Sequence, residues 1–245
     1  MSTAVDFHSH ILPGIDDGSK NPEESVEMLK CMQTQGIDCV VATPHFYPLH
    51  DQLDQFLERR EQAVAAFREK IGAISTPPEL HIGAEVHFFR GIGDCDALPL
   101  LTIDGGNYIM IELPHGVWND EIYRQIEHIC TKQNLHPIIA HIDRYLGGFR
   151  TAKKLERLWE LPVLIQANAD AFTNKRTEKK VMRMLKDGRI HLLGSDCHNL
   201  TTRKPNLEKA LRKIEKHLGT EVIARIHECE KAVLANEECI SHTHV

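Results

Sequence analysis

The chain begins with a short apolar strand that ends in Asp6-Phe7-His8-Ser9-His10. Residues two apart in a strand point to the same side, so His8 and His10 can aim both imidazoles at one cation. Such a pair also arises by chance, and by itself it predicts a metal site only weakly. The fold and the chemistry therefore depend on the residues at the ends of the other strands.

Apolar runs rich in β-branched residues predict further short buried strands. They lie at residues 38–43, 80–84, 108–111, 137–140, 163–166 and 190–194. Amphipathic segments predict helices at residues 22–35, 51–70, 119–134, 151–160, 174–187 and 204–235. The alternation predicts an α/β fold with a parallel sheet, and the absence of a glycine-rich phosphate fingerprint favours a TIM-like barrel. An open doubly wound sheet is the alternative.

Local signals mark several helix ends. Asn21 can cap a helix whose first turn contains Pro22, and Gly36 can end it. Asp187-Gly188 closes another helix in the same way. No linker or repeat divides the chain, so we expect residues 1–245 to form a single domain, with residues 236–245 as a frayed tail.

Composition restricts the class of protein. The 245 residues carry a formal net charge of -6, which offers no basic field for nucleic acid or an anionic membrane. No leader-like start and no apolar run of about 18 residues is present, so we expect a cytoplasmic protein without membrane insertion. The seven cysteines form no Cys-x-x-Cys cluster and are expected to be reduced thiols.

Histidines and carboxylates come after nearly every predicted strand. In barrels and open α/β sheets the carboxyl ends of the strands open onto one mouth, so these side chains are expected to meet there. They are His8, His10, Asp16, Asp17, His45, Glu85, Glu112, His141, Asp196 and His198. Taken singly, each is more simply a structural residue, but burying so many ionisable groups together requires compensating charge.

This mixture of nitrogen and oxygen ligands suits zinc, manganese or iron. One cation cannot use them all, and a carboxylate such as Glu85 can bridge two ions about 4 Å apart. The sequence therefore predicts a multinuclear hydrolytic site. Arg144 and Arg203 lie close to the predicted ligands and match phosphate oxygens, although each also suits a surface salt bridge.

Other histidines have less specific positions. His81, His128, His191, His217 and His227 lie inside predicted strands or on helix faces and are expected to be structural. His87 and His115 lie shortly after ligand candidates, and their role stays open.

In this order, the motifs resemble the PHP-domain phosphoesterases, specifically the bacterial protein-tyrosine phosphatases encoded with capsule and exopolysaccharide genes. The resemblance covers nearly the whole chain, with matching stretches at residues 6–18, 42–45, 83–85, 111–112, 139–145 and 194–199. It implies a distorted (β/α)₇ barrel of the PHP type with up to three divalent metal ions, foremost manganese.

The resemblance also implies a role for each matching residue. One metal would be held by His8, His10, Glu85 and Asp196, a second by Glu85, Glu112 and His141, and a third by Asp17, His45 and His198. It leaves open whether Asp16 or Asp17 is the ligand. Arg144 and Arg203 would bind the phosphoryl oxygens, and a metal-bridging hydroxide would attack phosphorus. The implied substrate is the phosphotyrosine-bearing tail of an autophosphorylating bacterial tyrosine kinase that regulates capsule or exopolysaccharide biosynthesis.

Three alternatives accompany this interpretation. The shared metal ligands also suit a histidinol phosphatase, another small-phosphoester hydrolase or a phosphodiesterase. Cys197 and Arg203 satisfy the Cys-x₅-Arg spacing of cysteine-dependent tyrosine phosphatases, but no glycine lies between them and Lys204-Pro205 comes next. The third alternative is a catalytically silent barrel that binds a phosphorylated partner.

Overall fold

Strands and helices alternate along most of the chain, as predicted. A computed structural model of the protein describes residues 4–72, 74–147 and 151–239. The strands are β1 (Ala4–Ser9), β2 (Ile37–Ala42), β3 (His45–Phe46), β4 (Glu79–Ile82), β5 (Glu85–His87), β6 (Tyr108–Glu112), β7 (His136–Ile139), β8 (Leu164–Asn168) and β9 (Leu192–Gly194). The α-helices are α1 (Pro22–Thr34), α2 (Leu53–Ile71), α3 (Asp120–Thr131), α4 (Thr151–Leu158), α5 (Ala169–Thr173), α6 (Glu178–Lys186), α7 (Leu207–Leu218) and α8 (Thr220–Leu234). Short 3₁₀ turns lie at Ile92–Asp94, Leu98–Leu101, Ile103–Gly105 and Ile142–Tyr145.

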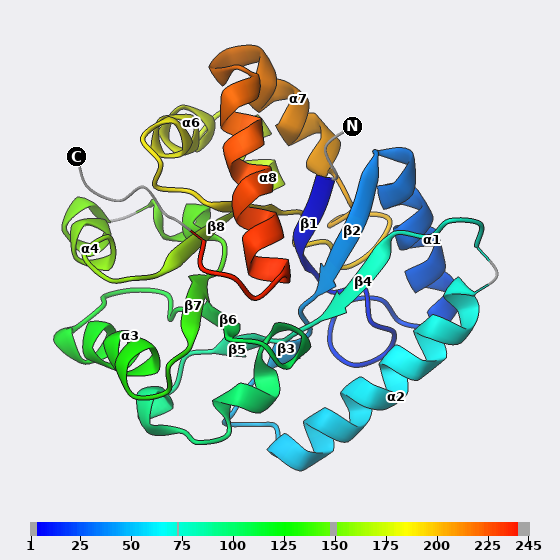
Figure 1. Ribbon diagram of the computed structural model, residues 1–245, viewed down its shortest axis with the longest axis horizontal. Helices are drawn as coiled ribbons and strands as arrows, with labels where there is room; N and C mark the ends of the chain where they lie inside the picture. Colours follow the sequence, from blue (N-terminus) through cyan, green and yellow to red (C-terminus); the bar gives the residue numbers. More distant parts are fainter. Residues whose placement is uncertain (1–3, 73, 148–150, 240–245) are drawn as a thin grey trace.

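The strands pair in parallel in two sheets, with the orders β1-β2-β4 and β3-β5-β6-β7-β8-β9. Backbone hydrogen bonds continue across the gap between the sheets, because Gly83 N donates to Ala42 O (2.8 Å) and Glu85 N donates to Pro44 O (2.9 Å). Just after β9, Asp196 N donates a hydrogen bond to His8 O of β1 (2.7 Å), so the last strand lies beside the first. The result is a curled parallel sheet (Figure 1), which confirms the predicted α/β class.

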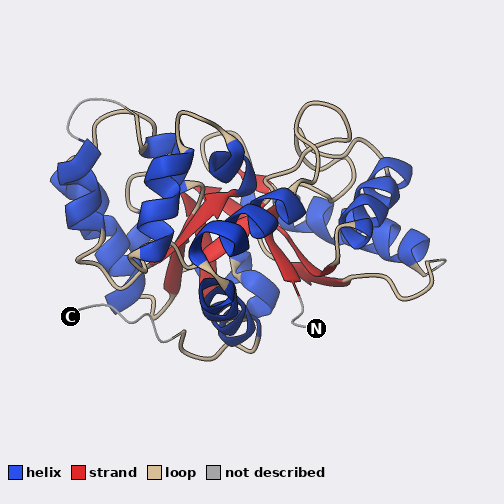
Figure 2. Ribbon diagram, turned by 90° about the horizontal axis from the view of Figure 1, so that it is seen from above, coloured by secondary structure: helices blue, strands red, loops and turns tan. Residues whose placement is uncertain are grey.

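Two apolar cores lie on the two faces of the curled sheet. The outer core packs the strands against the helices and includes Met28 and Met32 of α1 and Phe67 of α2. The inner core includes Phe7 and Met110, from opposite parts of the sheet. Figures 1 and 2 show helices around the strands, and in the middle of Figure 1 α8 lies in front of the strands.

Helix α8 and the residues after it cover the amino ends of the strands. Cys229 and Val233 of α8 belong to the inner core. Asn236 Oδ1 accepts a hydrogen bond from Asn107 N (2.6 Å), and Glu237 O accepts one from Tyr108 OH (2.7 Å), at the beginning of β6. The beginnings of β1 and β6 are therefore packed against α8 and the residues after it.

The predicted helix ends are confirmed. Asn21 caps α1 by accepting a hydrogen bond from Glu24 N (2.9 Å), and Gly36 lies just after the helix with a φ of 76°. Gly188, with a φ of 71°, lies just after α6. Residues 204–235 were predicted as a single helical segment. The structure contains two helices there, α7 and α8, which Gly219 separates with a φ of 87°.

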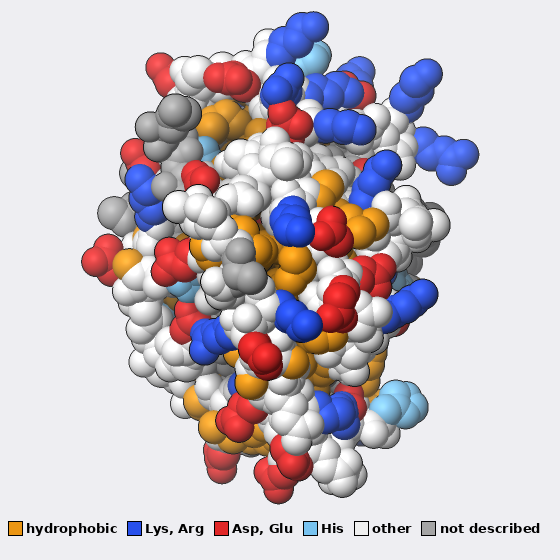
Figure 3. Space-filling view, turned by 90° about the vertical axis from the view of Figure 1, so that its right-hand side faces the viewer, with side chains coloured by type: hydrophobic (Ala, Val, Ile, Leu, Met, Phe, Trp, Pro, Cys, Tyr) orange, Lys and Arg blue, Asp and Glu red, His pale blue; other side chains and the backbone are white. Residues whose placement is uncertain are grey.

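The surface on the side of α1 and α2 carries interspersed acidic and basic side chains (Figure 3). Within the described residues, no helix has the length and apolar character required to cross a bilayer.

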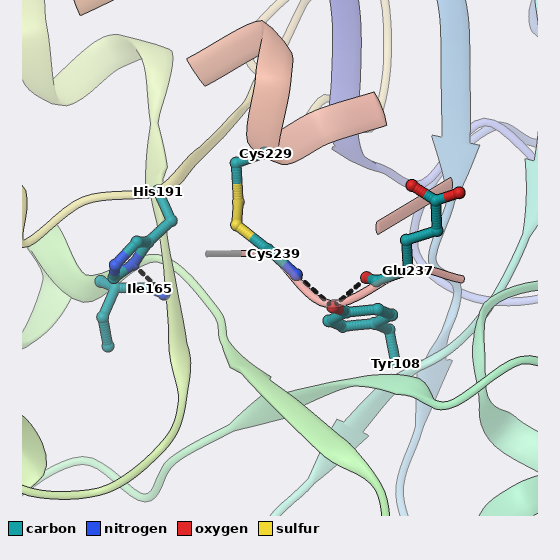
Figure 4. The surroundings of a disulfide bond; sticks show 6 residues. All are labelled: Tyr108, Ile165, His191, Cys229, Glu237 and Cys239. Atoms are coloured by element: carbon teal, nitrogen blue, oxygen red, sulfur yellow. Dashed lines mark hydrogen bonds between the residues drawn. A yellow bond between two sulfur atoms is a disulfide. The ribbon is translucent and has the colours of Figure 1, made fainter. Parts of the chain in front are cut away.

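The expectation that all cysteines are reduced was wrong. Cys229 and Cys239 form a disulfide, with their Cα atoms 5.2 Å apart, and the described free cysteines are Cys31, Cys39, Cys95, Cys130 and Cys197. Figure 4 shows how the chain turns back after α8: Tyr108 OH donates to Glu237 O and accepts from Cys239 N (3.1 Å). These contacts bring the two thiols together, which cysteine spacing alone does not reveal.

The disulfide predicts a specific thiol count. Protein purified without reductant and then unfolded should show five reactive thiols towards a chromogenic thiol reagent. Cys239→Ser should show one more than the wild type, because Cys229 is released, whereas Cys31→Ser should show one fewer. A wild-type count equal to all seven cysteines of the chain would contradict the disulfide.

Candidate metal centre

The nine residues predicted as metal ligands converge at the carboxyl ends of the strands. They are His8, His10, Asp17, His45, Glu85, Glu112, His141, Asp196 and His198. All of them except Asp17 are buried. His141 and Asp196 adopt positive φ values of 32° and 53°, shortly after β7 and β9. Such backbone conformations are unusual for residues other than glycine and concentrate at functional sites.

Glu85 lies at the centre of this cluster. Its Oε2 is 3.2 Å from His8 Nε2, 3.4 Å from His10 Nε2 and 3.0 Å from His45 Nδ1. Its other oxygen, Oε1, is 2.7 Å from His141 Nε2. A carboxylate with both oxygens facing different imidazoles has the geometry required to bridge two cations.

Three groups of side chains can each surround a metal ion. Within each group, one ligand atom per residue lies within 4.8 Å of the others. The groups are His8, His10 and Glu85; His10, Asp17, His45 and His198; and His45, Glu85 and Glu112. They overlap at His10, His45 and Glu85 and therefore form one connected centre.

The remaining predicted ligands border these groups. Asp196 Oδ1 lies 3.7 Å from His8 Nε2 and 3.5 Å from His10 Nε2. His141 Nε2 lies 3.5 Å from Glu112 Oε1. Asp196 is thus beside the first group and His141 beside the third.

Several buried atoms of the cluster fit a cation better than a hydrogen bond. Glu85 Oε2, His45 Nδ1 and His198 Nε2 are buried, and although the first two lie 3.0 Å apart, none of the three has a hydrogen-bond partner of suitable geometry among the described residues. Buried polar atoms without a partner are rare in folded proteins. The Nε2 atoms of His8 and His10 also face each other at 3.2 Å, where two lone pairs would repel unless a cation or a proton lies between them. The donor set therefore fits divalent metal ions.

Neighbouring side chains orient the first two histidines. His10 Nδ1 lies 2.7 Å from Asp16 Oδ2, and His8 Nδ1 lies 3.3 Å from Gln166 Oε1. An imidazole that donates from Nδ1 presents the lone pair of Nε2, the form that binds metals. Asp16 and Gln166 thereby hold both imidazoles in the ligand tautomer.

The geometry separates the two adjacent aspartates. Asp16 is engaged within the loop, because it also accepts hydrogen bonds from His45 N (2.9 Å) and Gly18 N (2.9 Å). Asp17 Oδ1 instead lies 3.2 Å from His198 Nε2 and 3.6 Å from His45 Nε2. Asp17 therefore faces the cluster as a ligand would, while Asp16 positions His10 and the loop.

The carboxylates of the cluster are held in their ionised form. Burial alone would raise the pKa values of Glu85 and Asp196, but the close approach of His8, when it is protonated, and of His10 holds both pKa values well below their ordinary range. Ionised carboxylates are the form that binds a cation.

Sequence reasoning missed the polar residues at the end of β8. Gln166 Oε1 also accepts a hydrogen bond from His141 N (2.5 Å), and Asn168 Nδ2 donates to Asp196 Oδ2 (2.8 Å). The signal was present, since Gln166 and Asn168 are two apart at the end of an apolar strand, like His8 and His10.

Asp6 was also missed: it accepts a hydrogen bond from Ser195 N (2.8 Å), and burial raises its pKa to about 6.

Both predicted phosphate-binding arginines reach the edge of the cluster. Arg203 Nη2 lies 2.6 Å from Asp196 Oδ1, and Arg144 Nη2 pairs with the other oxygen of the same carboxylate. The side chain of Arg203 is 36% exposed and that of Arg144 is 31% exposed, so both are partly open to solvent.

The histidines with less specific positions differ in their surroundings. His87 Nδ1 lies 3.0 Å from Glu112 Oε2 at the edge of the cluster, whereas His115 is exposed, with its ring 5.7 Å from that of Tyr145. The histidines expected to be structural contribute to none of the three metal-binding groups: His81, His128, His191, His217 and His227.

The position of Cys197 disfavours a cysteine nucleophile. The residue is fully buried and belongs to the outer apolar core. Burial raises the pKa of its thiol well above the ordinary value, which opposes the thiolate that a nucleophile requires.

The chain is similar to known proteins over most of its length. The family described as "Capsular polysaccharide synthesis, CpsB/CapC" matches residues 4–234. The tyrosine-protein phosphatase YwqE of Bacillus subtilis (strain 168) is 28% identical over 242 residues, which cover 95% of this chain and 92% of that protein. The tyrosine-protein phosphatase CpsB of Streptococcus pneumoniae is 25% identical over 228 residues, covering 88% of this chain and 91% of that protein.

A solved structure shares the fold. It comes from crystal structures of YwqE from Bacillus subtilis and CpsB from Streptococcus pneumoniae, described as unique metal-dependent tyrosine phosphatases. It superposes with a TM-score of 0.80 at 23% identity and covers 96% of this chain and 95% of the other.

The close approach of β9 to β1 predicts a sensitive position. A Cβ atom at Gly194 would lie 2.5 Å from His8 Cβ and 2.7 Å from His8 N, so Gly194→Ala should displace the His8 imidazole. We expect the affinity for Mn²⁺ to fall by roughly 10–100-fold, as when the support of a metal ligand is removed. Calorimetric titration of the metal-stripped protein measures this change.

Gly147→Ala is the matched control, since a Cβ atom there meets no atom of the described residues within 4 Å. It should bind Mn²⁺ like the wild type. Equal affinity for Mn²⁺ in the wild type and both variants, with folding verified by circular dichroism, would contradict the assignment of His8 as a metal ligand.

Proposed function

The chain belongs to the CpsB/CapC family of capsular polysaccharide synthesis, and from this membership we propose that it is a metal-dependent tyrosine-protein phosphatase. The observation that carries the proposal is the buried cluster around Glu85, bordered by two arginines. Relatives named tyrosine-protein phosphatases match the chain over most of its length, which supports the same chemistry here.

We assign the cluster as the metal-binding site of the enzyme. Its ligands are His8, His10, Asp17, His45, Glu85, Glu112, His141, Asp196 and His198, which hold up to three divalent ions. Manganese is our first choice, and zinc or iron suit the same mixture of imidazole and carboxylate. Bound there, such ions would supply a nucleophile from water near neutral pH and polarise the phosphoryl oxygens.

The residues around the ligands complete the chemistry. Arg144 and Arg203 bind the phosphoryl oxygens through their planar N–H forks, which suit phosphate better than the point charge of a lysine. Asp16 and Gln166 keep His10 and His8 in the ligand tautomer. A departing phenolate, whose conjugate acid has a pKa of about 10, requires less proton donation than an alkoxide does. A strong general acid is therefore less necessary for phosphotyrosine than for an alkyl phosphate.

We further propose that the fold is a distorted PHP-type barrel of seven β/α units, built as one domain over residues 1–245. In this count β2 with β3, and β4 with β5, each act as one bent strand, since backbone hydrogen bonds continue across both bends. The proposed substrate is the phosphotyrosine-bearing tail of a bacterial tyrosine kinase that regulates capsule or exopolysaccharide synthesis, and the proposed location is the cytoplasm.

Metal removal distinguishes this enzyme from a cysteine-dependent phosphatase. Chelation should abolish turnover of a phosphotyrosine peptide and Mn²⁺ should restore it, whereas Cys197→Ser should keep turnover within about threefold, because the buried thiol has no part in the reaction. Metal analysis before and after chelation accompanies the assay.

Two results would contradict the proposal. One is chelation-resistant turnover that Cys197→Ser abolishes, and the other is tight phosphopeptide binding without any turnover. Faster hydrolysis of histidinol phosphate or of a phosphodiester than of the phosphopeptide would instead assign the same site to another phosphoesterase.

The arginines predict a second kinetic effect. Arg144→Lys and Arg203→Lys keep the positive charge but lose the planar guanidinium, which can donate two parallel hydrogen bonds to phosphate. Each should therefore lower kcat/KM for a phosphotyrosine peptide by roughly 10–100-fold. Arg183→Lys on α6, where the side chain is 85% exposed, should leave it unchanged. Metal content must stay equal across the variants. If both substitutions leave kcat/KM at the wild-type value, the arginines do not bind the phosphoryl group.

A further inference from the structure

A pocket of about 390 Å³ lies beside the metal cluster. Its walls include Tyr47 and Leu49 from the loop after β3, and His87, Phe88 and Phe89 from the end of β5 and the residues just after it. Both segments come from the carboxyl ends of the strands, where the cluster lies. The pocket therefore opens at the same end of the sheet as the metal centre.

Aromatic contacts connect the pocket directly to the cluster. The ring of Tyr47 lies 4.8 Å from that of His45 and 5.6 Å from that of His87. His87 in turn lies 3.0 Å from the carboxylate of Glu112. His45 and Glu112 belong to the same potential metal-binding group. The pocket thus begins where the cluster ends, without an intervening layer of side chains.

This arrangement suits one kind of phosphate ester. In a tyrosyl phosphate the rigid phenyl ring is bonded directly to the ester oxygen, so a phosphoryl group at the cluster places the ring just outside it. Aromatic and aliphatic walls bind such a ring by apolar burial and offset stacking. A seryl phosphate has a single methylene in this place and brings the polar backbone to the mouth instead, so it cannot fill the pocket.

The rim of the mouth also carries exposed apolar side chains. Among the described residues, the large exposed hydrophobic side chains are Leu49, Leu100, Val117 and Leu200. Leu49, Val117 and Leu200 lie on loops after β3, β6 and β9, at the end of the sheet that holds the cluster. Leu49 is 84% exposed and also lines the pocket, so it can contact a polypeptide on which the phosphotyrosine stands.

We propose that the pocket between Tyr47 and Phe89 binds the phenyl ring of the phosphotyrosine substrate and selects tyrosyl over seryl phosphate. This inference rests on the proposed phosphatase function and assigns its substrate preference to particular residues. The metal ligands and arginines recognise the phosphoryl group, which is common to both esters. The pocket recognises the phenyl ring, which only the tyrosyl ester carries.

Paired substrates and paired variants test this assignment. We would measure kcat/KM with Mn²⁺ for two peptides of one sequence that carry phosphotyrosine or phosphoserine, and calorimetric binding of benzylphosphonate and ethylphosphonate. Phe89→Ala removes a wall of the pocket, and Leu49→Asp places a charge at its edge without removing a buried side chain. Leu100→Asp is the control, because Leu100 is 53% exposed and lies in the connection between β5 and β6.

The wild type and Leu100→Asp should prefer phosphotyrosine and benzylphosphonate by at least about tenfold. In Phe89→Ala and Leu49→Asp this ratio should fall at least about threefold. The fall should come from weaker binding of the phosphotyrosine peptide and of benzylphosphonate, while ethylphosphonate binding stays unchanged. An unchanged ratio in both variants, with the wild type active, would overturn the inference and leave the phosphatase function standing. If the wild type hydrolyses neither peptide, the phosphatase function itself fails.

Discussion

The buried carboxylate of Glu85 is the constraint on which the rest of the structure depends. It lies within 3.4 Å of imidazole nitrogens from His8, His10, His45 and His141, which come from different strands and the loops after them. A buried charge is tolerated only when compensating groups surround it, and here those groups are separated by more than a hundred residues of sequence. A curled parallel sheet satisfies this requirement because all its carboxyl ends meet at one place.

Placing the imidazoles near the carboxylate is not sufficient, because each must also present the correct nitrogen. Asp16 and Gln166 meet this need for His10 and His8 by taking up the other ring nitrogen. Backbone geometry contributes as well, since Asp196 stands in a left-handed conformation and Gly194 allows β9 to approach His8 closely. The two apolar cores and α8 at the opposite end hold these arrangements in place.

In the proposed phosphatase, substrate choice and chemistry occupy neighbouring but separate parts of the mouth. There the histidine and carboxylate cluster, with Arg144 and Arg203, would bind a phosphoryl group whatever it is attached to. The aromatic pocket beginning at Tyr47 touches the cluster through His45 and His87. Because the lining of the pocket includes none of the proposed metal ligands, changes in the loops that carry Leu49 and Phe89 would alter the proposed substrate preference without altering those ligands.

The sequence by itself determined the α/β class, both ends of α1, the carboxyl end of α6, and the residues that gather at the mouth, because periodicity, capping and position after a strand are local signals. It did not determine their partners. The choice of Asp17 over Asp16 as the residue facing the cluster, the hydrogen bond from His8 to Gln166 and the Cys229–Cys239 disulfide depend on distances between chain segments. Only the tertiary structure decided these, since an imidazole or a thiol acquires its partner from whatever side chain the folded backbone brings within bonding distance.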